Sequence, residues 1–194
     1  MKMKHLPVPF LLLMTSAACA QDMPLHEILK PGETWQPATT DMPKRPAGTY
    51  LIDSLKGPSI KNPACAATTL GDSTLLVAYA ADRYIWAYQI QEGGVLGPGD
   101  RYCRLRVKGD ERRKSSTPPD AYKADPSAMT VDGANRTHVA TNLGIQVFDP
   151  TGRLCGVFTA PPGRVTDLAF DGDRLFARVG DKTYVRQMLP VAAK

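Results

Sequence analysis

The chain has 194 residues, of which 43% are hydrophobic, 22% are charged and 7% are aromatic. This composition suits one folded domain with an ordinary core and excludes a wholly disordered chain. The formal net charge of +5 at pH 7 is modest, so charge alone does not indicate a nucleic-acid-binding protein.

The first twenty residues have the order of a secretory signal peptide. Two lysines precede an apolar stretch at residues 10–14, and small residues follow as far as Ala20. This is the usual sequence of basic, apolar and cleavage regions, so we expect an exported protein, periplasmic or secreted. The alternative is a lipoprotein signal in which Cys19 is acylated and anchors the chain. No other segment reaches the roughly 20 apolar residues of a membrane span, so no transmembrane segment is expected.

The next segment, residues 21–48, contains five prolines and two glycines and shows little periodicity. Such a composition predicts an extended Pro-rich leader rather than a helix. The apolar residues at 50–53 then predict a single outer strand.

Short apolar segments recur three times in the remainder of the chain, punctuated by Asp, Gly and Asn. This pattern is typical of antiparallel strands joined by tight turns. When the repeats are aligned on Val77, Val139 and Phe176, the second spacing approaches the blade repeat of about 40–50 residues and the first is longer. Residues 49–190 are therefore predicted to be an all-β region, a partial β-propeller of three to four four-stranded antiparallel blades.

The predicted blades cover about residues 62–98, 124–160 and 162–189, and an inserted loop at 99–123 explains the longer first spacing. The loop is rich in basic residues: Arg101, Arg104, Arg106, Lys108, Arg112, Arg113 and Lys114. A basic run can attract anionic polymers. Because only Tyr102 provides an aromatic among them, we interpret the run as a solvated loop and expect no nucleic-acid partner.

The reactive residue types show no familiar catalytic arrangement. Cys65, Cys103 and Cys155 have no metal-ligand spacing, and they fit either one disulfide with a free thiol or three free thiols. His138 is interpreted as a strand side chain rather than a general base. The chain has no dinucleotide-binding glycine motif, Walker loop, zinc-protease motif or Gly-x-Ser-x-Gly elbow.

Several segments together resemble one known family. They are residues 102–107, 128–132, 138–149 and 164–170, and in this order they are similar to the C-terminal blades of the gluconolactonase, regucalcin and senescence-marker-protein family. The resemblance implies a six-bladed propeller with a divalent cation, often calcium, in an axial pocket that hydrolyses sugar lactones. It also implies that residues 31–37 form an opening strand that pairs with the final blade. A ring of six blades needs about 240 residues, more than this chain has.

The metal-ligand motifs of that family are altered here. Ala64 stands where the family has Asn in a Pro-Asn-Gly turn, and Ser127 stands where it has Asp in an Asp-Gly-Met turn. Asp167 is expected at the equivalent place in the third repeat, near the start of the innermost strand. Hard cations need several oxygen ligands with negative charge among them, so calcium binding is expected to be lost. The other interpretation of Asp167 is that it caps its own turn.

Two functions remain open on this basis. The first is a propeller remnant, non-catalytic or weakly active, that binds a small sugar-like ligand or a partner. The alternative is a metal-dependent hydrolase of sugar lactones, with Asp167 as the catalytic residue and Asp167, Ser127 and Asp125 as an irregular cation site. Asn62 and Ala64 would then contribute to ligand binding. We further expect either a homodimer that completes the ring or a leader strand that covers the open edge.

Overall fold

The computed structural model describes residues 24–43, 55–57, 60–69, 71–108 and 123–191. The predicted signal peptide, with Cys19, and the predicted strand at 50–53 lie outside these residues, so both stay predictions. Within the described ranges, no helix is long and apolar enough to cross a membrane.

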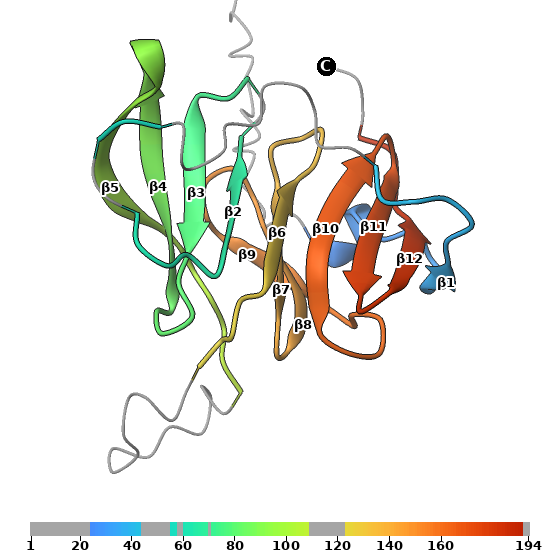
Figure 1. The fold of residues 1–194 in the computed structure, drawn as a ribbon. Coiled ribbons are helices and arrows are strands. Elements are labelled where there is room, and N and C mark those ends of the chain that lie inside the picture. The colour runs from blue at the N-terminus through green and yellow to red at the C-terminus, as the bar shows by residue number, and fades with distance from the viewer. Residues whose placement is uncertain (1–23, 44–54, 58–59, 70, 109–122, 192–194) are drawn as a thin grey trace, which may run out of the picture.

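The described residues form three antiparallel sheets of four strands each (Figure 1), which confirms the predicted all-β class. The first sheet contains, in order, β2 (Cys65–Thr68), β3 (Thr74–Ala78), β4 (Tyr84–Gln91) and β5 (Val95–Arg104). The second contains β6 (Ala128–Val131), β7 (Thr137–Thr141), β8 (Gly144–Phe148) and β9 (Leu154–Phe158). The third contains β10 (Val165–Asp171), β11 (Arg174–Val179), β12 (Lys182–Gln187) and β1 (Gln36–Pro37). Two short 3-10 turns, η1 (Leu25–Glu27) and η3 (Glu92–Gly94), complete the described elements.

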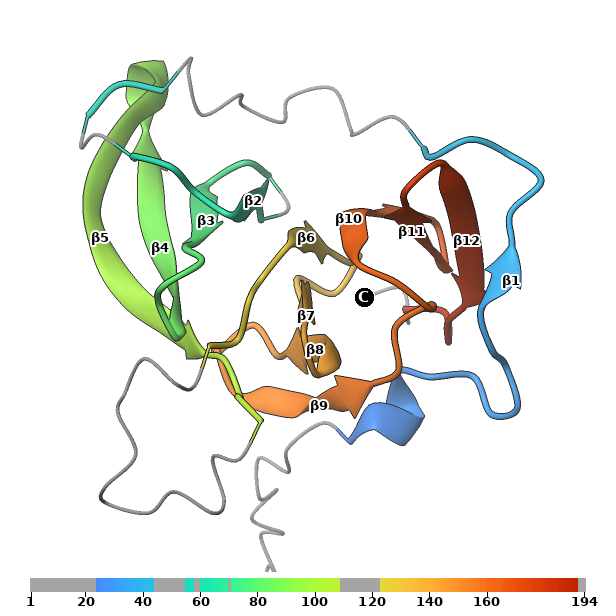
Figure 2. The same ribbon diagram turned by 60° about the horizontal axis from the view of Figure 1, so that its bottom comes forward.

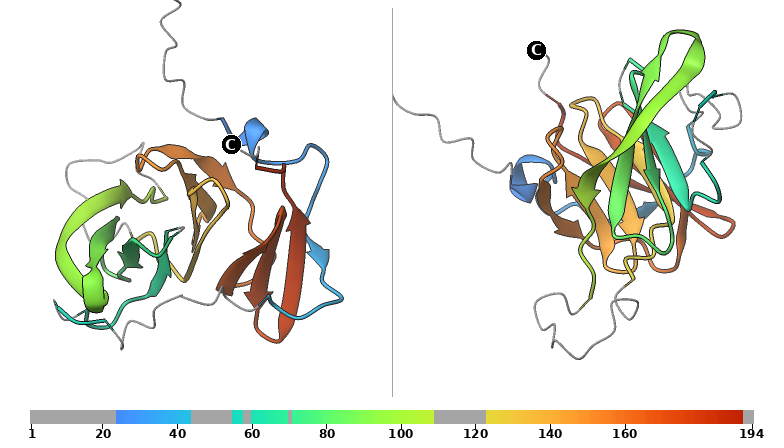
Figure 3. Two further views of the ribbon diagram at one scale, coloured as in Figure 1. Left: turned by 90° about the horizontal axis from the view of Figure 1, so that it is seen from above. Right: turned by 90° about the vertical axis from the view of Figure 1, so that its left-hand side faces the viewer.

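The sheets are arranged as neighbouring propeller blades. The innermost strand of the second sheet, β6, contacts both β2 and β10. Figures 2 and 3 show that the three sheets form an arc rather than a closed ring. The partial propeller is therefore confirmed, whereas the pairing of two copies to complete a ring stays a prediction.

Apolar side chains fill the spaces between the blades. Leu76, Ile85, Met129, Val139 and Phe148 belong to the core between the first and second sheets. A second core joins the second and third sheets. Because strand side chains alternate between two faces, the middle sheet contributes to both cores.

The leader completes the third sheet. In β1, Gln36 lies opposite Val185 of β12 in an antiparallel pairing, as expected for the opening strand. The Trp35 indole Nε1–H donates to the Thr159 carbonyl at 2.8 Å, and its ring stacks on Phe158. The leader thus connects the third sheet to the last strand of the second.

The first blade extends further than predicted. Strand β5 continues to Arg104, beyond the predicted end at residue 98, so Arg101 and Arg104 belong to a strand rather than to the inserted loop. The loop was predicted to begin at residue 99 from its many basic residues and from the longer first spacing. Gly99 instead lies opposite Tyr88 in β4, where a Cβ atom would stand 2.5 Å from the Tyr88 ring. Packing of the tyrosine, rather than a change of chain direction, requires this glycine.

Candidate functional site

The innermost strands β2, β6 and β10 all begin at the same end of the molecule, which we call the lower end because it is lower in Figure 1. Ala64, Ser127 and Asp167 occupy equivalent positions there. Each directly precedes a residue that pairs with an alanine of the following strand, namely Ala78, Ala140 or Ala177. The predicted equivalence of the three positions is therefore correct.

These three positions supply few metal ligands. Ala64 offers no side-chain oxygen, Ser127 offers a neutral hydroxyl, and Asp167 offers the one carboxylate of the three. Calcium takes about six to eight oxygen ligands, with carboxylates among them. In the part of the chain that the structure describes, no group of three or more His, Cys, Asp and Glu could hold a metal ion. The side chains present do not fit the cation that the family resemblance implies.

Asp125 forms a bidentate ion pair with Arg164. The Arg164 Nη1 donates to Asp125 Oδ2, and Nη2 donates to Oδ1 at 3.2 Å. The hydrogen bond and the negative charge of Asp125 raise the pKa of Arg164. The side chains are 59% exposed for Arg164 and 41% for Asp125, and ion pairs in such surroundings contribute about 0–1 kcal/mol. A charged ligand could therefore replace either partner at little cost.

A groove opens beside this pair, between the second and third sheets at the lower end. Its volume is about 420 Å³, within the range of about 300–1,000 Å³ that is usual for small-molecule sites. Its polar lining consists of Asp125, Ser127, Thr141, Asn142, Thr159 and Arg164. We call it the Asp125–Arg164 groove.

The structure unites only part of the predicted site. Asp125 and Ser127 line the groove, whereas Asn62, Ala64 and Asp167 are not among its lining residues. Asn62 is exposed and adopts a positive φ of 49° in the chain that leads to β2. Arg164 was not predicted as a site residue. It lies 39 residues from Asp125 in the sequence, and no local pattern signals a pairing over that separation.

A buried polar network occupies the other end of β6. The Asp132 Oδ2 accepts hydrogen bonds from Arg136 Nε at 2.6 Å and from His138 Nε2 at 3.1 Å. Burial lowers the pKa of His138 below its usual 6.5. Burial alone would raise the pKa of Asp132, but the His138 hydrogen bond and the neighbouring positive charges lower it to about 2. Since His138 is fully buried, it cannot meet a substrate, and its interpretation as a structural strand residue agrees with this setting.

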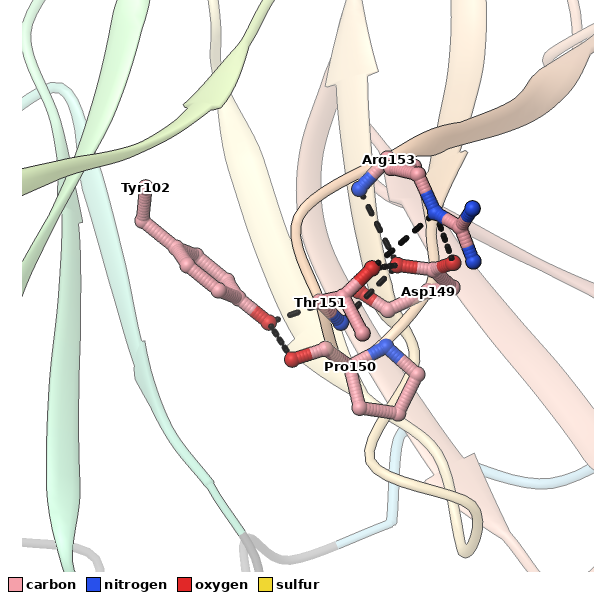
Figure 4. A network of polar contacts seen from close by, with 5 residues as sticks. All are labelled: Tyr102, Asp149, Pro150, Thr151 and Arg153. Atoms are coloured by element: carbon pink, nitrogen blue, oxygen red, sulfur yellow. Dashed lines mark hydrogen bonds and ion pairs between the residues drawn. The ribbon is translucent and has the colours of Figure 1, made fainter. Parts of the chain in front are cut away.

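The turn between β8 and β9 repeats the same arrangement (Figure 4). Asp149 Oδ1 accepts from the backbone N–H groups of Thr151 and Arg153, and Oδ2 accepts from Arg153 Nε at 3.1 Å. The Tyr102 hydroxyl donates to the Pro150 carbonyl at 2.8 Å. An aspartate paired with an arginine four residues later thus organises each turn, and Tyr102 links one such turn to the first blade.

Three cysteines, Cys65, Cys103 and Cys155, lie in the part of the chain that the structure describes. None of the three forms a disulfide, which agrees with one of the two expected alternatives. Burial raises the pKa of Cys65 to about 12 and raises that of Cys103 as well. Because the thiolate is the reactive form, neither of these two groups is activated at neutral pH.

Comparison with known proteins supports the fold. No protein-family model and no curated protein matches the sequence. Among solved structures, the chain is similar to a gluconolactonase from Xanthomonas campestris, with a TM-score of 0.51 and 21% identity over 65% of this chain and 37% of that one. It is also similar to a putative gluconolactonase, with a TM-score of 0.50 and 16% identity over 68% of this chain and 40% of that one. The chain thus has the fold of part of a gluconolactonase propeller and spans less than half the length of those two proteins.

Proposed function

We propose that this protein is a binding module without hydrolase chemistry, which holds a small, polar, sugar-like ligand in the Asp125–Arg164 groove. The observation that carries the proposal is the ion pair itself. It places a bidentate hydrogen-bond donor and a carboxylate at the rim of a groove of suitable size. Sugar hydroxyl groups both donate and accept hydrogen bonds, so such a rim suits them.

The possible metal ligands at the starts of the innermost strands favour binding over catalysis. With one carboxylate among Ala64, Ser127 and Asp167, too few charged oxygens converge to polarise a lactone carbonyl through a cation. Asp125, which would have to supplement them, lines the groove with Ser127, whereas Asp167 does not. A second candidate, a metal-dependent hydrolase of sugar lactones, is favoured by the likeness in fold to the two gluconolactonase structures.

Calorimetric titration of the full chain with gluconate, sorbitol and gluconolactone tests the binding proposal. We expect at least one of these probes to bind, and Arg164→Ala to weaken that binding by about tenfold or more, the usual worth of a charge-assisted hydrogen bond. Lys182→Ala is the matched control, because this exposed cation lies at the same end but outside the groove. Absence of binding for all three probes, or equal losses in the two variants, would contradict the proposal.

Metal analysis and lactone turnover separate the two candidates. A binding module contains no stoichiometric cation and hydrolyses gluconolactone no faster than buffer. Calcium titration of the wild type and of Ala64→Asn with Ser127→Asp adds a direct comparison, because the double variant gains two oxygen ligands. Turnover that depends on Asp167 and on a bound cation would establish the hydrolase instead.

A further inference from the structure

One titratable side chain lies between two of the blades. His138 of β7 is fully buried, and Ala140, two residues further along the same strand, belongs to the core that joins the second and third sheets. The His138 ring meets the Phe170 ring of β10 edge-to-face, with the ring centroids 4.9 Å apart. The imidazole is therefore part of the packing of the third sheet on the second.

The two ring nitrogens of His138 differ in their partners. Nε2 donates to Asp132 Oδ2 at 3.1 Å, whereas the buried Nδ1 has no hydrogen-bond partner among the described residues. In the neutral ring Nδ1 is an acceptor, and protonation turns it into an N–H donor. A buried donor without an acceptor costs about 1–3 kcal/mol. The packed arrangement therefore accommodates the neutral ring and disfavours the imidazolium.

The charges that act on His138 come from its own hairpin. Burial, the largest effect, opposes protonation of the ring, Asp132 favours it, and Arg136 opposes it. Together these effects hold the pKa of His138 below its usual 6.5. Asp132 alone thus does not compensate for burial.

The other elements around His138 supply no acceptor for Nδ1. Neither β6 nor β8 contains a titratable residue. On β10, Asp167 and Asp171 lie on the face opposite to Phe170, because successive side chains of a strand alternate. On β12, the charge that acts on Arg186 is that of Glu33. Water is the remaining acceptor, and it reaches the ring only if the packing loosens.

We infer that the contact between the second and third sheets is an acid-sensitive switch, which opens when His138 is protonated at Nδ1. Opening moves Phe170 away and lets water accept from the new N–H. The hairpin of β6 and β7 keeps its form, since Asp132 also accepts from the backbone N–H groups of Ala134 and Arg136. The open state binds the proton more tightly than the closed state, so acid favours it. This inference goes beyond the proposed function, and its test uses no groove ligand.

Oxidation of two buried methionines by hydrogen peroxide reports on the two interfaces between sheets. Met188 is 2% exposed in the core between the second and third sheets, and Met129 is 5% exposed in the core between the first and second. Conversion to the sulfoxide requires peroxide to reach the sulfur, so its rate follows the open population. Peptide mass spectrometry on the full chain measures both rates between pH 7 and pH 5.

We expect the two methionines to respond differently to acid. The Met188 rate should rise by at least about threefold between pH 7 and pH 5, and by no more than about tenfold per pH unit, the limit for one proton. The Met129 rate should change by less than about twofold, because the first and second sheets stay packed. Circular dichroism at each pH checks that the chain remains folded.

Two matched variants assign the response to one histidine. His138→Gln replaces the ring by a side chain that does not titrate, so its Met188 rate should not depend on pH. His26→Gln removes the exposed histidine of the leader and should leave the acid response intact.

Three results would overturn the inference. The first is a Met188 rate in the wild type that does not rise in acid. The second is an equal rise at Met129, which would mean a general loosening of the fold. The third is a rise at Met188 that persists in His138→Gln or disappears in His26→Gln. The first two results need no variant, so the inference is testable even if His138→Gln does not fold.

Discussion

Asp125 and Asp132 flank the same short strand, β6, and differ in almost every physical respect. Asp132 is 2% exposed and accepts hydrogen bonds from two backbone N–H groups, an arginine and a histidine. Asp125 is 41% exposed at its side chain and pairs with Arg164 alone among the contacts described above. The first carboxylate is committed to the fold, whereas the second can exchange its partner for a ligand. Burial and the number of fixed donors, rather than residue type, separate an aspartate that is fixed in the fold from one whose contact is exposed to solvent.

The largest expected effect comes from removing the buried carboxylate. Asp132→Ala leaves Arg136 and His138 without their acceptor in a dry environment, which costs about 3–5 kcal/mol of unfolding free energy. Urea denaturation measures this loss. Asp171→Ala is the control, since the Asp171–Arg174 pair is exposed and its removal should cost less than about 1 kcal/mol. Similar losses in the two variants would remove the contrast between a buried and an exposed aspartate.

Acidification should weaken the buried network in two steps. The pKa of His138 is below 6.5 in the folded protein, so this group favours folding fully above pH 6.5. That contribution is lost as the pH falls below 6.5, by at most about 1.4 kcal/mol per pH unit. The pKa of Asp132 is lowered to about 2, so its contribution persists above about pH 3.8 and is lost between there and pH 2. Urea denaturation of the wild type and of His138→Gln at pH 7, 6 and 5 measures the His138 step. The variant should lack this fall in unfolding free energy. Parallel stability curves would show that His138 does not titrate as expected.

The exposed pair should contribute little to stability. A double-mutant cycle of Asp125→Ala and Arg164→Ala is expected to give a coupling free energy of about 0.2–1 kcal/mol. The reason is that both side chains remain hydrated. A coupling free energy above about 2 kcal/mol would mean that the pair stabilises the packing of the second sheet on the third and is not easily replaced by a ligand.

The smallest expected effect is that of salt on the free energies that Asp125 and Asp132 contribute. In 1 M sodium chloride the screening length is about 3 Å, so the coupling between Asp125 and Arg164 should fall to nearly zero. The cost of Asp132→Ala should change little, because solvent ions do not reach a buried pair. Measuring both variants in low and high salt tests this, and equal salt dependence would contradict it.

The sequence predicts the fold better than it predicts the site. Turn residues and apolar repeats recur at blade spacing, so they locate the sheets and the equivalence of Ala64, Ser127 and Asp167. The length of β5 could not be foreseen, because Gly99 makes room for Tyr88 across the sheet and does not form a turn. The groove was also missed, since Asp125 and Arg164 meet only after two separate sheets have packed. Local patterns describe hairpins, whereas contacts between blades depend on tertiary packing.

The pairing of β1 with β12 has a consequence for the order of events during folding. Trp35 contacts Thr159 across 124 residues of chain, so the leader cannot reach its final place until Thr159 and strand β12 have been synthesised. Closing so long a loop is slow, because its entropy is lost before the contacts form. The first two sheets, whose strands are consecutive hairpins, can form on the ribosome. The third must wait with an unpaired edge on β12, and in that interval the nascent chain is most exposed to aggregation and to chaperone capture.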